Sequence, residues 1–421
     1  MSFTRCKDHF KLPNNFYYIK KCVMKIAYHY HIELLKFRKN YYVSSFWGKY
    51  VTEISKRSNL IVVAWVRRVK EKPKLYSLDN RRIKVFDLGE KPSSFLKNFL
   101  RLPQFFFQIY KNKELSDIDF FGFEVPTFYA IYFWPFYRRK RFFLFLAGDL
   151  PSCIFKNRDL GIFKKLILYT YFSLDKFFLI KMCNRSVVFG ENLQRFETDN
   201  NKFIDFYHHV KPKRNNLLMN TFHSKDVRQG RHVRSFSNNK KLKLITVTRI
   251  AFENSIMFIV DVARKILERN KDFEWLVIGD GPAEGSLRNE INKYNLNKNI
   301  ILCGYIDHGS KFNQKLLDAD IYVEPYIPNG PGPARAAWEG LSFGLPLVAG
   351  SPCKRPYLKN KNNIIFAKTN TPTDFSNAIL STWKNTNLRQ RLSHNSLNIA
   401  KRRSLDKEIF NMIELLKHYE K

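Results

Sequence analysis

Apolar runs alternate with segments of helical periodicity along the C-terminal part of the chain, from Lys241 onward. Near-continuous apolar runs stand at 242–247, 273–278, 300–305, 321–324 and 347–349. Between them, apolar residues recur at helical spacing over 256–269, 283–294, 312–319 and 334–342. Apolar strands that alternate with amphipathic helices are typical of βαβ units, in which helices cover both faces of a parallel sheet. The pattern predicts a doubly wound, Rossmann-like α/β domain.

The first 210 residues carry a weaker form of the same alternation. Strands are expected at 24–30, 60–66, 83–87, 118–121, 141–147 and 186–189, with a long helix over 161–182. A second α/β domain fits this pattern. We therefore expect an N-terminal domain over 1–215, a C-terminal domain over 241–400 and a final helix over 401–421. The polar, basic stretch 216–240 is expected to link the two domains.

Composition adds a strong basic charge to this picture. Of 421 residues, 44% are apolar and 16% aromatic, which excludes intrinsic disorder. The net charge is +36, of which +27 falls within the first 240 residues. An N-terminal half of this kind suits an anionic membrane surface, for example through Arg138 to Arg141 beside Trp134, Phe142 and Phe143. An AT-rich genome would also enrich Lys, Phe and Tyr.

Cysteine usage and the chain's apolar stretches bear on location. Six cysteines lie far apart with no CxxC pair, as in a reducing cytosol, and the first thirty residues show no signal-peptide pattern. The longest apolar stretch, 125–137, is broken by two prolines and is too short to span a bilayer. We expect a cytoplasmic protein, soluble or peripheral on the inner face of the membrane. His29 and His31 are interpreted as structural, because no third metal ligand lies near them in the sequence.

The segment 325–350 (PYIPNGPGPARAAWEGLSFGLPLVAG) carries the candidate chemistry. A Gly- and Pro-rich loop runs to Gly332, and Pro333 then suits the first position of a helix. The unpaired N–H groups at such a helix start form an anion site. Glu339 follows about one and a half turns later, where it can reach a hydroxylated group beside the anion. A phosphate at a helix start with a ribose held by a carboxylate is the chemistry of nucleotide binding.

In this arrangement the chain resembles the C-terminal domain of GT-B glycosyltransferases, specifically the retaining group 1 or family-four enzymes. The resemblance covers 240–418 and consists of several landmarks in the same order. They are Thr248-Arg249-Ile250, 276–282 (LVIGDGP), 300–306 (IILCGYI), 339–348 (EGLSFGLPLV) and the closing helices over 388–419. The resemblance implies two Rossmann-like domains that face each other across a cleft, with the last helix crossing back to the N-terminal domain.

The resemblance also implies which residues contact the nucleotide-sugar donor. They are Arg249, Asn254, Gly279, Gly281, Tyr305, Ile306, Gly332, Pro333, Arg335, Ala336 and Glu339. Two positions depart from the family pattern. Pro331 stands where the family has the first of two glutamates eight residues apart, which contacts the transferred sugar. Asn254 stands where the family has a lysine.

Sugar transfer requires stabilisation of the leaving nucleoside diphosphate. Arg249 can make forked, charge-assisted contacts to phosphate oxygens, and the backbone N–H groups of Arg335 and Ala336 can add donors. Asp149 follows a buried strand and is expected to face the cleft and orient or deprotonate the acceptor hydroxyl, unless its role is structural. Gly279 and Gly281 fit a turn as well as a ligand contact. The resemblance implies retention without a metal, so no metal or other cofactor is expected.

These observations predict a glycosyltransferase that moves a sugar from a nucleotide-sugar to a lipid-linked or surface-polysaccharide acceptor. The alternative, motivated by Pro331 and Asn254, is a weakly active or inactive GT-B relative that serves as a binding or partner subunit. Nucleic-acid binding is disfavoured because the sequence has no helix-turn-helix or zinc signature. A dinucleotide dehydrogenase is disfavoured because no G-x-G-x-x-G follows a first strand.

Overall fold

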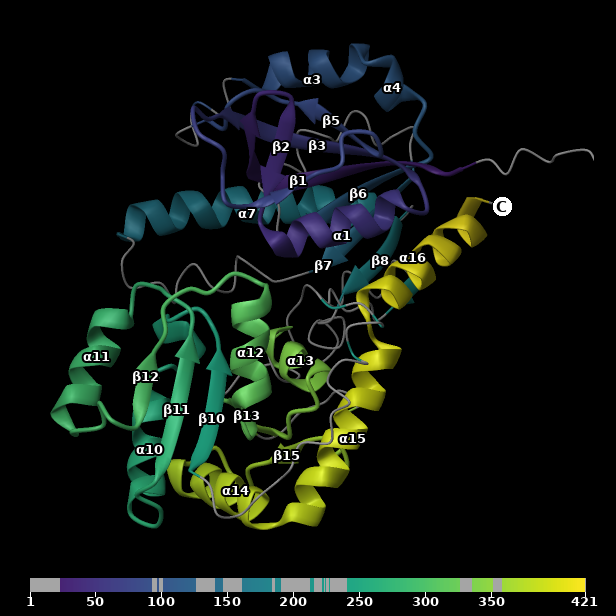
Figure 1. Cartoon of the computed structure of the whole chain (residues 1–421). Helices are drawn as coiled ribbons and strands as arrows, with labels where there is room; N and C mark the ends of the chain where they lie inside the picture. Colours follow the sequence, from purple (N-terminus) through teal and green to yellow (C-terminus); the bar gives the residue numbers. More distant parts are fainter. Residues whose placement is uncertain are drawn as a thin grey trace, which may run out of the picture.

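The computed structural model contains two α/β units, each built on its own sheet (Figure 1). It describes residues 23–92, 97, 101–125, 141–146, 161–183, 186–190, 213–215, 222, 224, 227, 241–325, 335–350 and 358–420. Five positions or segments named in the sequence analysis fall outside these ranges. They are Asp149, Pro331 to Pro333, Trp134, 138–140 and most of 216–240.

The C-terminal unit has a parallel sheet with the strand order of dinucleotide-binding folds. Its strands are β10 (Leu242–Val247), β11 (Phe273–Ile278), β12 (Ile300–Leu302), β13 (Ile321–Glu324), β14 (Leu347–Ala349) and β15 (Ile365–Phe366). They run in the order β12-β11-β10-β13-β14-β15, and every pairing is parallel. Numbered by their order in the sequence, the strands stand as 3-2-1-4-5-6. Successive strands are added on one side of β10 up to β12, and on its other side from β13 onward. The doubly wound domain expected from the apolar runs is confirmed.

Helices cover both faces of this sheet, as the periodicity predicts. They are α10 (Phe258–Leu267), α11 (Glu284–Lys293), α12 (Ser310–Asp318), α13 (Arg335–Ser342) and α14 (Pro372–Lys384). One core cluster centres on Trp275 and Val323, and a second packs Trp338 of α13 against Tyr322 of β13. Gly340 permits that packing, because a Cβ there would collide with the Tyr322 ring. The close approach fixes α13, and with it Glu339, over the sheet.

The N-terminal unit has a mixed sheet of nine strands. They are β1 (Lys25–Phe37), β2 (Asn40–Val43), β3 (Asn59–Arg68), β4 (Tyr76–Ser77), β5 (Ile83–Asp87), β6 (Phe120–Val125), β7 (Arg141–Leu146), β8 (Ser186–Gly190) and β9 (Lys213–Asn215). Its helices are α1 (Ser45–Ser55), α3 (Leu102–Lys111), α4 (Lys113–Ser116) and α7 (Ile162–Cys183). Strands β5, β3, β1, β6, β7, β8 and β9 pair in parallel, which confirms the second α/β domain.

One part of this sheet differs from the sequence prediction. The expected strand ended at Tyr30, but β1 continues to Phe37 because its second half pairs antiparallel with β2. The turn between them places Arg38 at φ 54°, a left-handed conformation. Helix α1 follows directly and buries Trp47 and Tyr50 beneath the sheet. The hairpin thus delivers the start of α1, at Ser45, to the side of the C-terminal unit.

The last two helices join the units. Helix α15 (Thr386–Arg402) packs on α13, whereas α16 (Leu405–Glu420) crosses to the N-terminal unit beside α1 (Figure 1). Ile409, Met412 and Leu416 are fully buried in the N-terminal core. The Tyr50 hydroxyl lies 3.9 Å from the sulfur of Met412. The crossing helix implied by the resemblance is confirmed.

One expectation about surface residues needs correction. Phe142 and Phe143 are buried in β7, so their rings pack in the core and are not available to lipid. Within the expected linker, Phe222 and Val227 are buried against the C-terminal unit, and the backbone and hydroxyl of Ser224 donate to Asp406 at 2.8 and 2.6 Å. These three positions are therefore anchored.

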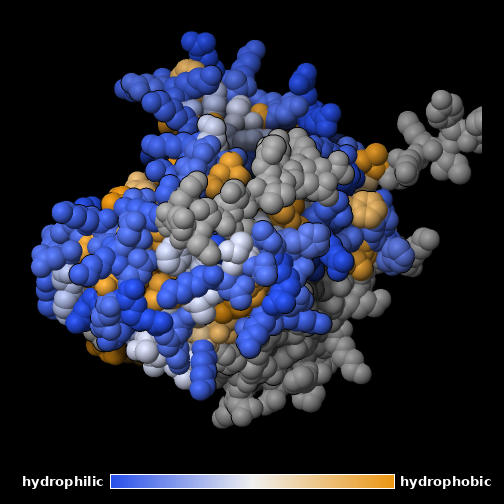
Figure 2. Space-filling view, turned by 60° about the horizontal axis from the view of Figure 1, so that its bottom comes forward, coloured by the Kyte–Doolittle hydropathy of each residue, from blue (hydrophilic) through white to orange (hydrophobic). Residues whose placement is uncertain are grey.

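The rest of the described surface is mainly polar. In Figure 2 hydrophilic residues dominate the exposed face, with hydrophobic residues scattered among them. Within the described ranges, every helix is too short or too polar to cross a bilayer.

Candidate functional site

Three strand ends and one helix start meet at the edge of the C-terminal sheet that faces the N-terminal unit. Strands β10, β11 and β12 end there, and α13 begins there (Figure 1). In open α/β sheets, ligands bind at the carboxyl ends of the strands, beside the point where the strand order reverses. We refer to this region as the cleft edge, comprising residues 248–254, 279–281, 303–308 and 335–339.

Arg249 and Asn254 lie in the loop that follows β10. The Arg249 side chain is exposed at the cleft edge. The side-chain amide of Asn254 donates to the backbone carbonyl of Arg249 at 2.9 Å, and also reaches the Thr248 hydroxyl at 3.4 Å. Asn254 thus braces the turn that presents Arg249, instead of supplying the cation that the family has at this position. The geometry leaves Arg249 as the exposed cation of this loop.

Gly279 and Gly281 bring the loop after β11 against the loop after β10. Both adopt positive φ, at 139° and 153°, and a Cβ at either position would collide with the carbonyl of Thr248 or Ile250. The Ile250 N–H donates to the Asp280 carbonyl at 2.8 Å, which ties the two loops together. Only glycine fits these close approaches. Both glycines therefore form the turn, which was one of the two roles that the sequence allowed. The two loops pack closely together beside Arg249.

Glu339 is held by a residue that the sequence reasoning did not select. Its side chain is only 10% exposed, and its Oε1 lies 2.5 Å from Nε2 of His308 in the loop after β12. The His308 ring packs against Phe312, with 4.9 Å between ring centroids. Burial opposes the charged imidazole, but the hydrogen bond and charge of Glu339 outweigh it and raise the pKa of His308. The carboxylate and the imidazole form a charge-assisted pair at the cleft edge.

The loop after β12 carries the remaining predicted contacts. Tyr305 is exposed, and its hydroxyl donates to Oδ1 of Asp307 at 3.3 Å. Partial burial, followed by the negative charge of Asp307, raises the pKa of Tyr305, so the phenol stays protonated at neutral pH. Ile306 packs on the C-terminal core. An exposed ring next in sequence to a partly buried aliphatic residue offers a surface on which a nucleotide base can stack.

Asp307 connects this loop to the N-terminal unit. Its Oδ2 accepts a hydrogen bond of 2.9 Å from the hydroxyl of Ser45, the first residue of α1. Its Oδ1 accepts the backbone N–H of His308 at 2.9 Å. Asp307, His308 and Ser45 were missed by the sequence reasoning. The signal for the first two was present, because they directly follow the apolar run 300–305 and so lie at the cleft edge.

The helix start gives a partial view of the predicted anion site. Helix α13 begins at Arg335, followed by Ala336, and places Glu339 on its second turn as expected. Gly332, Pro333 and the departure at Pro331 lie outside the described residues, as does Asp149. The structure therefore unites Arg249, Tyr305, Ile306, the start of α13 and Glu339 around one edge.

The positions of the histidines and acidic residues bear on metal binding. Within the described ranges, His, Cys, Asp and Glu residues do not gather in groups of three or more that could hold an ion. Nδ1 of buried His29 lies 3.0 Å from the carbonyl of Val63, and its ring contacts Phe123, so its side chain is packed within the N-terminal unit. The side chain of His31 is outside the described set.

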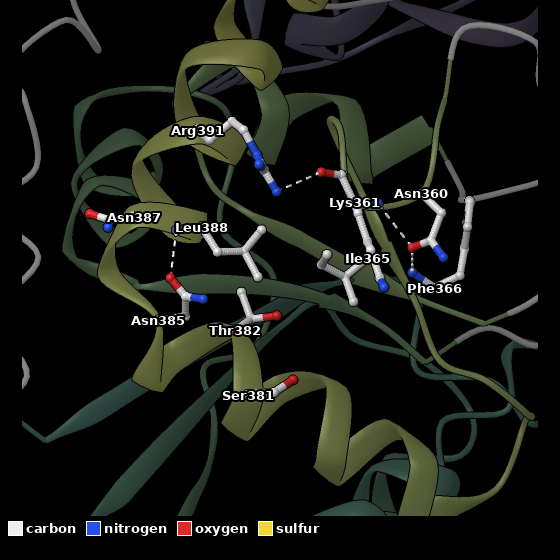
Figure 3. Close-up of a pocket in the computed structure, with 10 residues that line it drawn as sticks. All are labelled: Asn360, Lys361, Ile365, Phe366, Ser381, Thr382, Asn385, Asn387, Leu388 and Arg391. Carbon is white, nitrogen blue, oxygen red and sulfur yellow. Dashed lines mark hydrogen bonds between the residues drawn. The ribbon is translucent and has the colours of Figure 1, made fainter.

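A separate hollow lies between α14, α15 and β15, as Figure 3 shows. Around it, Arg391 donates to the carbonyl of Lys361 at 3.2 Å, and the Leu388 N–H donates to Asn385 at 2.9 Å. Its lining contains none of the cleft-edge residues. This hollow is therefore distinct from the predicted nucleotide site.

Comparisons with known proteins found a family match to part of the chain. Residues 228–398 match the family model described as glycosyl transferases group 1. A protein from Escherichia coli K12 named as a colanic acid biosynthesis glycosyltransferase, WcaL, is 25% identical over 112 residues. That match covers 26% of this chain and 27% of WcaL, so the chain aligns with about a quarter of the curated relative's length.

Solved structures resemble the whole described architecture. The Anabaena protein HepE, crystallised with UDP and glucose, has a TM-score of 0.62 at 13% identity, covering 94% of this chain and 99% of HepE. Sucrose-phosphate synthase from Thermosynechococcus elongatus has a TM-score of 0.64 at 13% identity, covering 94% and 98% of the two chains. The fold is that of the GT-B glycosyltransferases. The family match is confined to residues 228–398, which include most of the landmarks that indicated it.

Proposed function

We propose that the protein is a glycosyltransferase that takes its sugar from a nucleotide-sugar bound at the cleft edge. The observation that carries the proposal is the placement of Glu339, a nearly buried carboxylate on the second turn of α13, a helix that packs on β10, the strand leading into the exposed Arg249 loop. A helix start attracts a diphosphate, and a carboxylate one turn further on suits a ribose diol. HepE, which shares the fold, was crystallised with UDP and glucose.

In this proposal each cleft-edge residue has a chemical task. Arg249 and the first N–H groups of α13 stabilise the negative charge that grows on the leaving diphosphate. Tyr305 and Ile306 support the base, and Glu339 binds the ribose. Asp149 is proposed to orient the acceptor hydroxyl, and transfer is proposed to proceed with retention and without a metal. The compact glycine loops keep these groups in place, so that little reorganisation is needed during transfer.

The acceptor is proposed to be a lipid-linked or surface polysaccharide, reached from an anionic membrane surface. Support comes from one side of α7. There Ile162, Phe163 and Leu166 are 67%, 78% and 51% exposed, and Ile167 and Leu174 extend the same stripe. Lys164 and Lys165 flank the stripe. An exposed apolar stripe with lysines beside it suits the headgroup region of an anionic bilayer.

Binding of nucleoside diphosphates tests the proposal most directly. Purified protein should show saturable heat on titration with at least one of UDP, GDP and ADP, and a higher melting temperature in its presence. Glu339→Ala should weaken that binding about tenfold or more, because a ribose hydroxyl loses a charged partner. Glu268→Ala, an exposed acid at the end of α10, is the matched control and should bind normally. Absence of binding to all three nucleotides would overturn the proposal.

A binding subunit without transferase activity is the second candidate. The use of Asn254 as a loop brace favours it, because the family's cation is missing there. Nucleotide binding without transfer or donor hydrolysis in the presence of membranes would support this candidate. Release of the nucleoside diphosphate from a nucleotide-sugar would exclude it.

A further inference from the structure

The hydrogen bond between His308 and Glu339 links the loop after β12 to α13 at the cleft edge. It joins Nε2 of an imidazole to Oε1 of a carboxylate whose side chain is 10% exposed. We propose that His308 is a positioning residue, which holds the Glu339 carboxylate in the orientation that receives the ribose hydroxyl groups. This inference rests on the proposed nucleotide site and assigns it a residue outside the set implied by the family resemblance.

Burial makes such a partner necessary for Glu339. A carboxylate removed from water needs hydrogen-bond donors to remain charged, and a charged carboxylate is the form that accepts two ribose hydroxyls. His308 supplies a donor from a ring that is itself fixed. The ring packs on Phe312, and the backbone N–H of His308 is bonded to Oδ1 of Asp307. Loss of the imidazole would release the Glu339 side chain to other rotamers and weaken ribose binding without removing any ligand contact.

The charges around His308 determine how this support depends on pH. Burial and Lys49 of α1 oppose the protonated ring, whereas Glu339 and Asp307 favour it, with a net rise in the pKa of His308. Tyr305, bonded to Asp307, is a neutral phenol in this range because its own pKa is raised. Below the raised pKa the bond to Glu339 is charge-assisted, and above it the neutral ring donates more weakly. Nucleotide affinity should therefore fall as the pH rises through the pKa of His308.

The test compares two substitutions, with UDP, GDP and ADP as calorimetric probes. His308→Ala should weaken binding of the preferred nucleotide about tenfold, whereas His308→Gln, whose amide can still donate to Glu339, should stay within about threefold. Relative to His308→Gln, the wild type should lose affinity as the pH rises through the pKa of His308, and the ratio of the two affinities cancels titration of the nucleotide itself. In a transfer assay the donor KM of His308→Ala should rise while kcat changes little.

The outcomes separate this inference from the proposed function. Wild-type binding with unchanged affinity in His308→Ala would overturn the positioning role alone. Tighter binding in His308→Ala would also overturn it, since the imidazole would then compete with the ribose for Glu339. If the wild type binds none of the three nucleotides, the proposed function fails and the inference fails with it. If His308→Ala does not fold, the pH dependence of the wild type relative to His308→Gln still tests the inference. The melting temperature of His308→Gln shows whether that variant is folded.

Discussion

The two sheets of this protein differ in what their loops and surfaces are suited to bind. In the C-terminal unit the loops after β10 and β11 are bonded to each other through backbone groups and close glycine contacts. In the N-terminal unit the core is rich in aromatic residues, and helix α7 exposes an apolar stripe between lysines. Rigid loops at strand ends suit a small ligand of fixed shape, whereas an exposed helical stripe suits an extended surface. This difference supports the proposal that one unit binds the donor and the other meets the surroundings of the acceptor.

The largest expected effect concerns the helix that joins the two units. Met412 of α16 is fully buried in the N-terminal core and contacts Tyr50. Met412→Ala should destabilise the protein by about 2–5 kcal/mol, because it leaves a cavity in that core. The urea unfolding midpoint, followed by circular dichroism, measures the change. Phe410→Ala, on the exposed side of the same helix, is the control and should lower the midpoint far less. Equal shifts of the midpoint in the two variants would mean that the buried side of α16 does not hold the two units together.

The next largest effect tests the assignment of the donor to the C-terminal unit. Arg249→Ala should lower the rate of transfer about a hundred- to a thousandfold, the cost typical of one preorganised donor to a developing negative charge. Release of nucleoside diphosphate from the donor at saturation measures it. Arg288→Ala removes an exposed arginine that is paired with Glu284 on α11, and should leave the rate unchanged. A normal rate in Arg249→Ala would remove that residue from the proposed chemistry.

The C-terminal unit could be predicted from the sequence as far as β14, because its signals there are local, whereas β15 and α14 were not predicted. Three of its strands, 242–247, 273–278 and 321–324, match the observed limits of β10, β11 and β13. Buried parallel strands are continuous apolar runs, and the glycines at 279 and 281 mark where they must turn. Glu339 was found because its place on α13 depends only on helical spacing.

What could not be predicted depends on contacts distant in sequence. The extension of β1 to Phe37 results from pairing with β2, and the periodicity of that segment alone does not reveal a partner strand. His308 is separated from Glu339 by 31 residues, and Ser45 from Asp307 by 262. Phe142 and Phe143 illustrate the opposite error. Beside basic residues they fit a lipid-facing cluster, whereas their place in a central strand buries both rings.

A smaller effect sharpens the assignment of the membrane surface to the N-terminal unit. Phe163→Ser, which removes the most exposed ring of the α7 stripe, should reduce binding to anionic phospholipid vesicles about tenfold. Cosedimentation with vesicles that contain phosphatidylglycerol measures it, and neutral vesicles should bind the wild type weakly. Tyr110→Ser, at an exposed ring of α3, is the matched control. If both variants bind as the wild type does, α7 is not the membrane contact.

The smallest expected effect tests whether the N-terminal unit influences nucleotide binding by the C-terminal unit. The Ser45 hydroxyl donates to Asp307, whose other oxygen holds the backbone of His308, so α1 is linked to Glu339 through one short loop. Ser45→Ala removes this link and should weaken nucleotide binding about two- to fivefold, the range of a single hydrogen bond.

The control for this last test lies on the same helix. Ser55→Ala deletes a hydroxyl that bonds only within α1, to the carbonyl of Thr52 at 2.8 Å among the described contacts, and should leave affinity unchanged. Comparison of Ser45→Ala with the double variant Ser45→Ala/His308→Ala decides how the effect travels. If the serine acts through His308, the double variant should bind no more weakly than His308→Ala alone. Additive losses would instead mean that the N-terminal unit affects the donor site by a route that does not involve this loop.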